Sequence, residues 1–145
     1  GNDGSVRAWT RDGAPRMLAQ HTGAVTALAV RLPWVASAGR DHVVISAPLA
    51  GGAAMRSTLS AAAVALAVDP RGEVHAVTRA GAIEHAPGAG SIVELAHGAR
   101  TALQISADRW RVARDDGAVV MLPLTAPALD GFAAAVSAAT HYRLR

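Results

Sequence analysis

The sequence predicts an all-β protein built from repeated four-stranded antiparallel sheets. One short motif, Asp-Gly or a degenerate form of it before apolar residues, recurs at Asp3, Asp41, Ala80 and Asp116, at spacings of 36 to 39 residues. Short apolar runs rich in Val and Ala, bounded by Gly, Pro or Asp, lie between the copies and are typical of strands. A period near 40 residues indicates a repeat architecture in which each repeat is one small sheet.

The repeats divide most of the chain into similar units. In the first complete repeat, apolar runs at 25–30, 34–39 and 43–46 are separated by turn residues. Further short runs at 54–58 and 91–95 are expected to supply fourth, outer strands. This pattern predicts about three and a half units within residues 1–122. The expected bounds are a partial unit at 1–19 and complete units at 20–58, 59–95 and 96–122.

Two segments of the repeat resemble a known family. Residues 1–9 read GNDGSVRAW and residues 20–25 read QHTGAV. Both are similar to repeats of the WD-repeat family of β-propellers, strongly in the first 46 residues and weakly in the second complete repeat. The resemblance implies propeller blades, which close into rings of 4–8. We therefore expect either the C-terminal part of a longer bacterial polypeptide, or a chain that closes a ring of about seven blades with a second copy.

The resemblance also implies a set of hydrogen-bonded side chains, namely His, Ser or Thr, Asp and Trp, in each blade. The first complete repeat has the first three of these residue types but Ala47 at the tryptophan position. The second has Ala80 in place of Asp, so packing and strand pairing must replace the polar set there. The residues expected to form this structural set are His21, Ser37, Asp41, His97, Asp116 and Trp9.

No residue pattern favours catalysis or a metal site. His21, Ser37 and Asp41 are the residue types of a hydrolase triad, but no nucleophile elbow or oxyanion site accompanies them, so a structural role is the better interpretation. His75 and His85 are expected to face each other across adjacent strands, as a solvated pair in preference to a metal site. We expect a protein that is not an enzyme and holds no metal and no cofactor.

Two tryptophans occupy nearly equivalent positions in different repeats. Trp34 precedes Asp41 by about as many residues as Trp110 precedes Asp116. As exposed aromatics they would be anchors for a partner. The favoured alternative is that each covers the lower edge of its blade.

Composition excludes several functional classes. The chain of 145 residues has a net charge of +3, and its basic residues are scattered arginines without lysine, which argues against a nucleic-acid stripe and favours a bacterial origin. No apolar run is long enough to span a membrane. Without cysteine, disulfides and thiol chemistry are excluded. The expected location is cytoplasmic.

The tail, residues 123–145, departs from the repeat. Pro127 is placed near the first turn of a short helix expected over 128–139, although Gly131 weakens it. Residues 140–144 alternate like a terminal strand. We expect this strand to pair with the last blade and to provide its missing outer strand.

The best functional interpretation is a non-catalytic protein-interaction scaffold or sensor in a larger signalling or regulatory protein. Its partner is another protein or the remaining blades of the same polypeptide. Charged residues near one end of the inner strands are expected to tune association. The alternatives are an enzyme or small-ligand propeller with a site in the central channel, and an architectural fragment that closes a ring. The candidate partner-binding residues are Arg40, His42, Arg79, Arg100 and Asp115.

Overall fold

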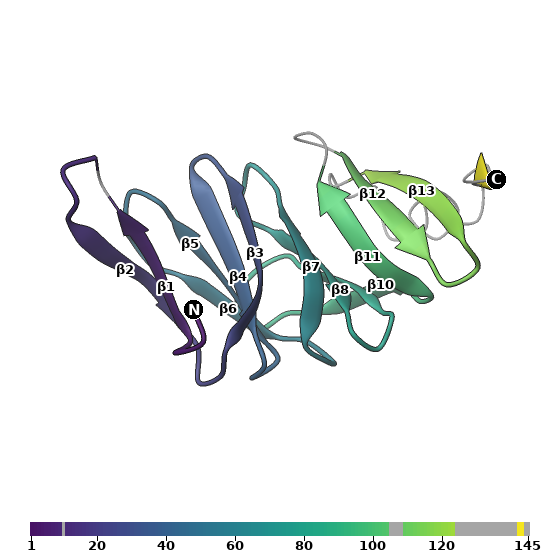
Figure 1. The fold of residues 1–145 in the computed structure, drawn as a ribbon, viewed down its shortest axis with the longest axis horizontal. Helices are drawn as coiled ribbons and strands as arrows, with labels where there is room; N and C mark the ends of the chain where they lie inside the picture. Colours follow the sequence, from purple (N-terminus) through teal and green to yellow (C-terminus); the bar gives the residue numbers. More distant parts are fainter. Residues whose placement is uncertain (10, 105–108, 124–141, 144–145) are drawn as a thin grey trace.

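The strands of the computed structural model form a row of four packed sheets (Figure 1). All the secondary structure that it describes is β, as the repeat pattern predicts. The helix expected over 128–139 lies outside the described residues. The structure describes residues 1–9, 11–104, 109–123 and 142–143.

The sheets follow one another in chain order, and we call them blades 1 to 4. Blade 1 has two strands and the others have four each. Within every blade, each strand pairs antiparallel with the next one in sequence. Blade 1 contains β1 (Ser5–Trp9) and β2 (Pro15–Gln20). Blade 2 contains β3 (Val25–Arg31), β4 (Trp34–Gly39), β5 (Val43–Pro48) and β6 (Met55–Thr58).

The remaining blades repeat this topology. Blade 3 contains β7 (Ala63–Val68), β8 (Val74–Thr78), β9 (Ile83–Ala86) and β10 (Val93–Ala96). Blade 4 contains β11 (Ala99–Gln104), β12 (Arg109–Arg114), β13 (Ala118–Pro123) and β14 (Tyr142–Arg143). β14 pairs antiparallel with β13, so the tail supplies the outer strand of blade 4 as its alternation predicts.

The recurring motif forms the turn before β1 in blade 1 and before the third strand in each of the other blades. Gly4, Gly81 and Gly117 occupy this position with φ of 76°, 88° and 82°. His42 takes the same place in blade 2 with φ of 61°. Glycine adopts a left-handed backbone conformation easily, whereas this conformation costs energy for other residues. This explains why glycine recurs in the motif.

The hydrophobic core lies between the blades. Successive residues of a strand point to opposite faces of its sheet, so each blade contributes to two contacts. In β8, Val74 and Ala76 pack in the core shared with blade 2. Val77 faces the other way, into a core with Trp110 of blade 4. Small residues such as Ala36, which is fully buried, allow the sheets to approach closely.

The innermost strands β3, β7 and β11 lie side by side along the row (Figure 1). Each has an irregularity in its pairing after the first residue, so that one extra residue is inserted near its start. Such bulges redirect a side chain away from the regular alternation. The inserted residues are Thr26, Val64 and Arg100.

Candidate interaction surface

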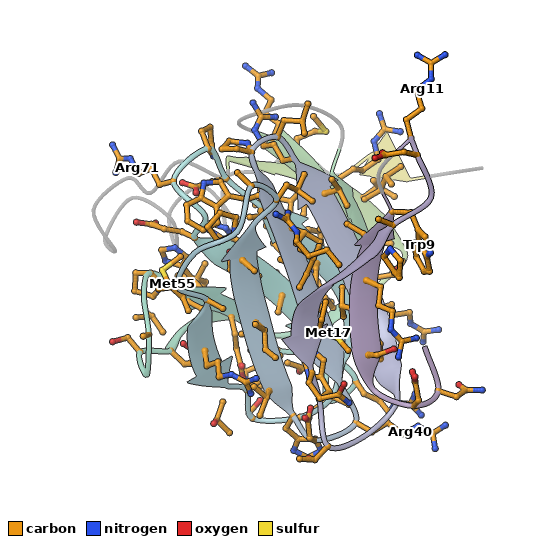
Figure 2. All side chains as sticks on the ribbon, turned by 90° about the vertical axis from the view of Figure 1, so that its left-hand side faces the viewer. Trp9, Arg11, Met17, Arg40, Met55 and Arg71 are labelled. Atoms are coloured by element: carbon orange, nitrogen blue, oxygen red, sulfur yellow. The ribbon has the colours of Figure 1, made fainter. Side chains whose placement is uncertain are left out.

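The candidate functional residues lie at one end of the strands, along one edge of the row of sheets. Each innermost strand begins there, beside the turn between the second and third strands, and we call this end the turn face. The arrangement repeats through backbone bonds: Arg40 N–H donates to Ala24 O at 2.9 Å, and Arg79 N–H donates to Ala62 O at 2.8 Å. Figure 2 shows Arg40 at the turn face and Arg11 at the opposite end of the sheets.

In blade 2 the turn face is held by a buried polar set. His21 Nε2 lies 2.9 Å from Ser37 Oγ, and its Nδ1 lies 3.1 Å from Asp41 Oδ1. Asp41 also accepts the backbone N–H groups of Thr22 at 2.9 Å and Val43 at 3.2 Å. The three side chains therefore join the loop before β3 to the second strand and to the following turn.

Electrostatics fit this role for Asp41. Burial raises the pKa of its carboxyl group, but hydrogen bonds from the Thr22 and Val43 amides and from His21 outweigh burial and leave the pKa below its usual value. Gly39 lies against the set, since a Cβ there would be 2.5 Å from Asp41 Oδ1 and 2.8 Å from His21 Nδ1. A glycine is thus required for close approach at this position.

Blade 3 holds its turn face with a different carboxylate. Glu84 on β9 is buried, and both of its oxygens accept the Ser60 N–H, at 3.1 and 3.3 Å. Ser60 corresponds to Thr22 of blade 2, where Asp41 is the acceptor. Glu84 therefore takes the role of the aspartate of the repeat, whose position in blade 3 is occupied by Ala80. Sequence reasoning missed it, although an acidic residue within an apolar strand is a signal for a buried, hydrogen-bonded group.

The polar set predicted for blade 4 does not form. His97 is exposed and pairs with Glu94, Nε2 to Oε1 at 2.9 Å, instead of with Asp116. Asp116 accepts the Ala118 N–H at 3.0 Å within its own turn. His97 follows β10 directly, and its exposed ring lies beside Glu94 of that strand. The position corresponding to Ser37 is Val112, which offers no hydroxyl group to a histidine.

Trp9 also departs from the predicted set. Its side chain is 66% exposed, and no hydrogen bond reaches it from the residues that the structure describes. Among the strands that the structure describes, blade 1 contains β1 and β2, so no inner strand of this blade lies beside the indole.

Three of the predicted partner-binding residues surround one groove on the turn face. Arg79, Arg100 and Asp115 line it together with Val64, and its volume is about 380 Å³. The bulges in β7 and β11 direct Val64 and Arg100 toward it. Arg100 Nε donates to Asp115 Oδ1 at 2.9 Å in an exposed ion pair. The structure thus brings together residues from blades 3 and 4.

Arg40 and His42 lie on the adjacent turn of blade 2. Both side chains are exposed, and Arg40 packs through its Cβ against Gly23. Neither Arg40 nor Arg79 forms an ion pair with any carboxylate of the described segments. The turn face therefore presents two arginines that form no ion pair with a described carboxylate, next to Arg100, which is paired with Asp115.

A second groove runs along the inner strands. It has a volume of about 510 Å³ and is lined by residues of β3, β7 and β11. Leu28, Val30 and Leu103 are exposed on these strands, and Arg31 is the charged residue of the lining. Acidic groups and histidines that would serve acid–base chemistry are not among its lining residues.

The remaining sequence candidates are structural. His75 and His85 do face each other, but the prediction of a solvated pair is wrong because both are buried. Trp34 Nε1 donates to Pro70 O at 3.2 Å and its ring covers Gly72, so it joins blade 2 to a turn of blade 3. Trp110 is fully buried between blades 3 and 4 and is not a surface anchor.

No group of three or more His, Asp or Glu side chains in the described segments is arranged to hold a metal ion. In the same part of the chain, no helix has the length and apolar character needed to cross a bilayer.

Comparisons with known proteins identify the fold. No protein-family model and no curated protein matches the chain. Among solved structures, the computationally designed Ika8 protein matches with a TM-score of 0.67 and 23% identity, over 85% of this chain and 41% of that one. BamB from Moraxella catarrhalis, a β-propeller, matches with a TM-score of 0.58 and 17% identity, over 83% of this chain and 45% of that one.

A third solved structure agrees with the other two. A protein of unknown function from Bacteroides caccae matches with a TM-score of 0.53 and 13% identity, over 86% of this chain and 52% of that one. The chain thus spans between 41% and 52% of the lengths of the three proteins. At these identities the likeness defines the fold alone, which is that of a β-propeller with blades of four-stranded antiparallel sheets, of which blade 1 shows two strands.

Proposed function

We propose that this chain is a non-catalytic protein-interaction module, similar to WD-repeat scaffolds, which binds a partner on its turn face. The observation that carries the proposal is the pair of exposed arginines, Arg40 and Arg79, on successive blades without a carboxylate partner in the described part of the chain. Charged groups of this kind steer association and set specificity. The partner class that fits them is an acidic protein segment.

The geometry of the triad-like residues supports this non-catalytic role. Ser37 is only 1% exposed, and its hydroxyl group is bonded to a histidine that is itself buried. A nucleophile must reach a substrate carbonyl and lie beside an oxyanion site. His21, Ser37 and Asp41 instead fix the loops from which Arg40 and His42 extend.

The lengths of the similar structures support a proposal about the wider context. The chain spans 45% of BamB, and we propose a role within a larger polypeptide whose remaining blades complete the ring. We propose that this polypeptide is a bacterial, cytoplasmic signalling or regulatory protein in which the blades act as scaffold or sensor. A second copy that completes the ring is the alternative partner.

The proposal is tested with a fluorescently labelled peptide rich in Asp and Glu, titrated with the chain at low and at high salt. The double variant Arg40→Glu/Arg79→Glu should weaken binding by at least about tenfold, since two exposed charge pairs of about 0.7 kcal/mol each are lost. Binding by the unchanged chain should also weaken at high salt.

The matched control reverses the charge at two arginine positions at the other end of the sheets. Arg11 and Arg71 are labelled in Figure 2 away from Arg40. The variant Arg11→Glu/Arg71→Glu has the same net charge as the test variant, and it should bind nearly as well as the unchanged chain. Equal weakening in both double variants would show that only net charge matters, and it would contradict a turn-face site.

A further inference from the structure

A stacked pair of histidines lies in the contact between blades 3 and 4. His75 on β8 and His85 on β9 are cross-strand partners, with ring centroids 4.3 Å apart and an angle of 13° between the rings. Trp110 of blade 4 meets the His75 ring edge-on, with centroids 5.7 Å apart. His75 is 2% exposed and Trp110 is fully buried. The pair is therefore part of the surface along which the two blades meet.

The polar atoms of this cluster are unequally satisfied. His85 Nε2 lies 3.0 Å from Glu73 Oε2. His75 Nδ1 and Trp110 Nε1 are both buried without a hydrogen-bond partner. Unsatisfied buried groups are rare, because each costs free energy relative to its hydrated state. This contact contains an imidazole that gains hydration, and can gain a proton, only when the blades separate.

The equivalent contact between blades 2 and 3 has no imidazole among the described residues, although Ser46 Oγ is also buried there without a hydrogen-bond partner. There, Ala36 and Ser46 are cross-strand partners at the positions of His75 and His85. Val74 takes the place of Trp110, in a core made of aliphatic side chains together with Trp34. The chain thus contains two similar blade contacts, of which one carries titratable rings and the other does not.

The surroundings of His75 oppose a positive charge. Burial, together with the smaller effect of the neighbouring His85, lowers its pKa from the usual 6.5 to about 3. Of the elements packed around the pair, β7 presents Ala67 and β10 presents Val93, neither of which is charged.

The nearest charged groups do not offset this effect. Glu73, in the turn before β8, is bonded to His85 and is not a partner of His75. Blade 4 contributes Ala99 from β11 and Trp110 from β12 to the contact. Arg109 and Arg111 of β12 are exposed. Among the described residues, His75 therefore has no acidic partner that would stabilise its protonated ring within the contact.

We propose that the contact between blades 3 and 4 is an acid-sensitive joint, in which uptake of a proton by His75 favours separation of the two blades. The neutral ring stacks on His85 and packs on Trp110, whereas the protonated ring is stable only in water. This property is independent of the partner proposed for the turn face, and the contact between blades 2 and 3 lacks it.

The sign and the size of the pH effect on blade separation follow from the linkage between proton binding and separation. The ring has a pKa of about 3 in the closed contact and takes up its proton near 6.5 when hydrated, so the separated state binds more protons between these values. The contribution of the closed contact to the free energy of blade separation is complete above pH 6.5 and is lost as the pH falls toward 3. From pH 7.5 to pH 5.0 the equilibrium constant for separation rises about 30-fold, which is about 2 kcal/mol.

The first test is urea unfolding of the variant Trp9→Phe/Trp34→Phe, in which Trp110 is the single tryptophan and reports on the joint. We expect the free energy of unfolding read from its emission to be about 2 kcal/mol lower at pH 5.0 than at pH 7.5. Adding His75→Phe, which keeps a ring but cannot take up a proton, should abolish most of this difference. Should the phenylalanine variant not fold, His75→Asn serves the same purpose.

The control is His97→Gln, which removes an exposed histidine and should leave the pH response unchanged. Hydrogen exchange, corrected for the intrinsic effect of pH on amide exchange, then locates the change. Amides of β12 and β13 should lose protection at pH 5.0 while those of β4 and β5 keep it. The proposal is overturned if the His75 variants retain the full response, or if blades 2 and 4 lose protection equally.

Discussion

Removing the Asp41 carboxylate tests how the turn face is held together. In Asp41→Ala, the buried His21 Nδ1 loses its partner at 3.1 Å, and the Thr22 and Val43 amides lose an anionic acceptor. An unsatisfied buried group costs about 1–3 kcal/mol, whereas the amide of exposed Thr22 can turn to water. We expect a total loss of about 3 kcal/mol, or about 1.5 M in the urea midpoint at an m-value of about 2 kcal/mol/M.

The assay is equilibrium urea unfolding at pH 7.5, followed by far-UV circular dichroism. Asp115→Ala is the matched control, because it removes an aspartate of the same face whose ion pair with Arg100 is exposed. Exposed pairs contribute about 0–1 kcal/mol, so this variant should unfold close to the unchanged chain. A loss below about 1 kcal/mol for Asp41→Ala, equal to that of the control, would refute the structural role of the set.

Three further predictions use the same unfolding assay. Glu84→Ala should cost about 2 kcal/mol, because the buried carboxylate no longer accepts the Ser60 N–H, whereas Glu94→Ala at an exposed pair should cost less than 1 kcal/mol. Equal losses would contradict the assigned role of Glu84. His42→Gly should stabilise the chain by about 1 kcal/mol by relieving its positive φ, and destabilisation would argue against that strain. Because the pKa of Asp41 is lowered, its contribution is present above the usual value of 3.8 and is lost as the pH falls through the lowered one. The variant Asp41→Asn should lack this acid-dependent loss, which a stability profile from pH 5 to 2 would measure.

The repeat made the fold predictable from sequence. Each turn before a third strand needs a left-handed residue, so glycine recurs at a spacing that reveals the blades. The His21, Ser37 and Asp41 set was predictable for a related reason, since its three residue types occupy fixed positions in the repeat. Strand pairing of the tail followed from simple alternation.

Other features depended on the packing between blades, which a single repeat does not reveal. Alternation along β8 and β9 correctly paired His75 with His85, but whether that face met solvent or blade 4 depended on the next sheet. Likewise, Glu84 could take in blade 3 the role that Asp41 has in blade 2 only because its place on β9 puts the carboxylate 3.1 Å from the Ser60 N–H. His97 failed to join Asp116 because nothing in the sequence spacing specifies the direction of a loop side chain.

The most direct test of the account is to map where an acidic peptide binds, by following backbone amide shifts of the isotopically labelled chain during a titration. A turn-face interaction module predicts shifts confined to the loops at 21–24, 40–42, 79–81, 98–100 and 115–117. Shifts concentrated on β3, β7 and β11, along the groove of the inner strands, would contradict it and would favour a ligand site in the central channel.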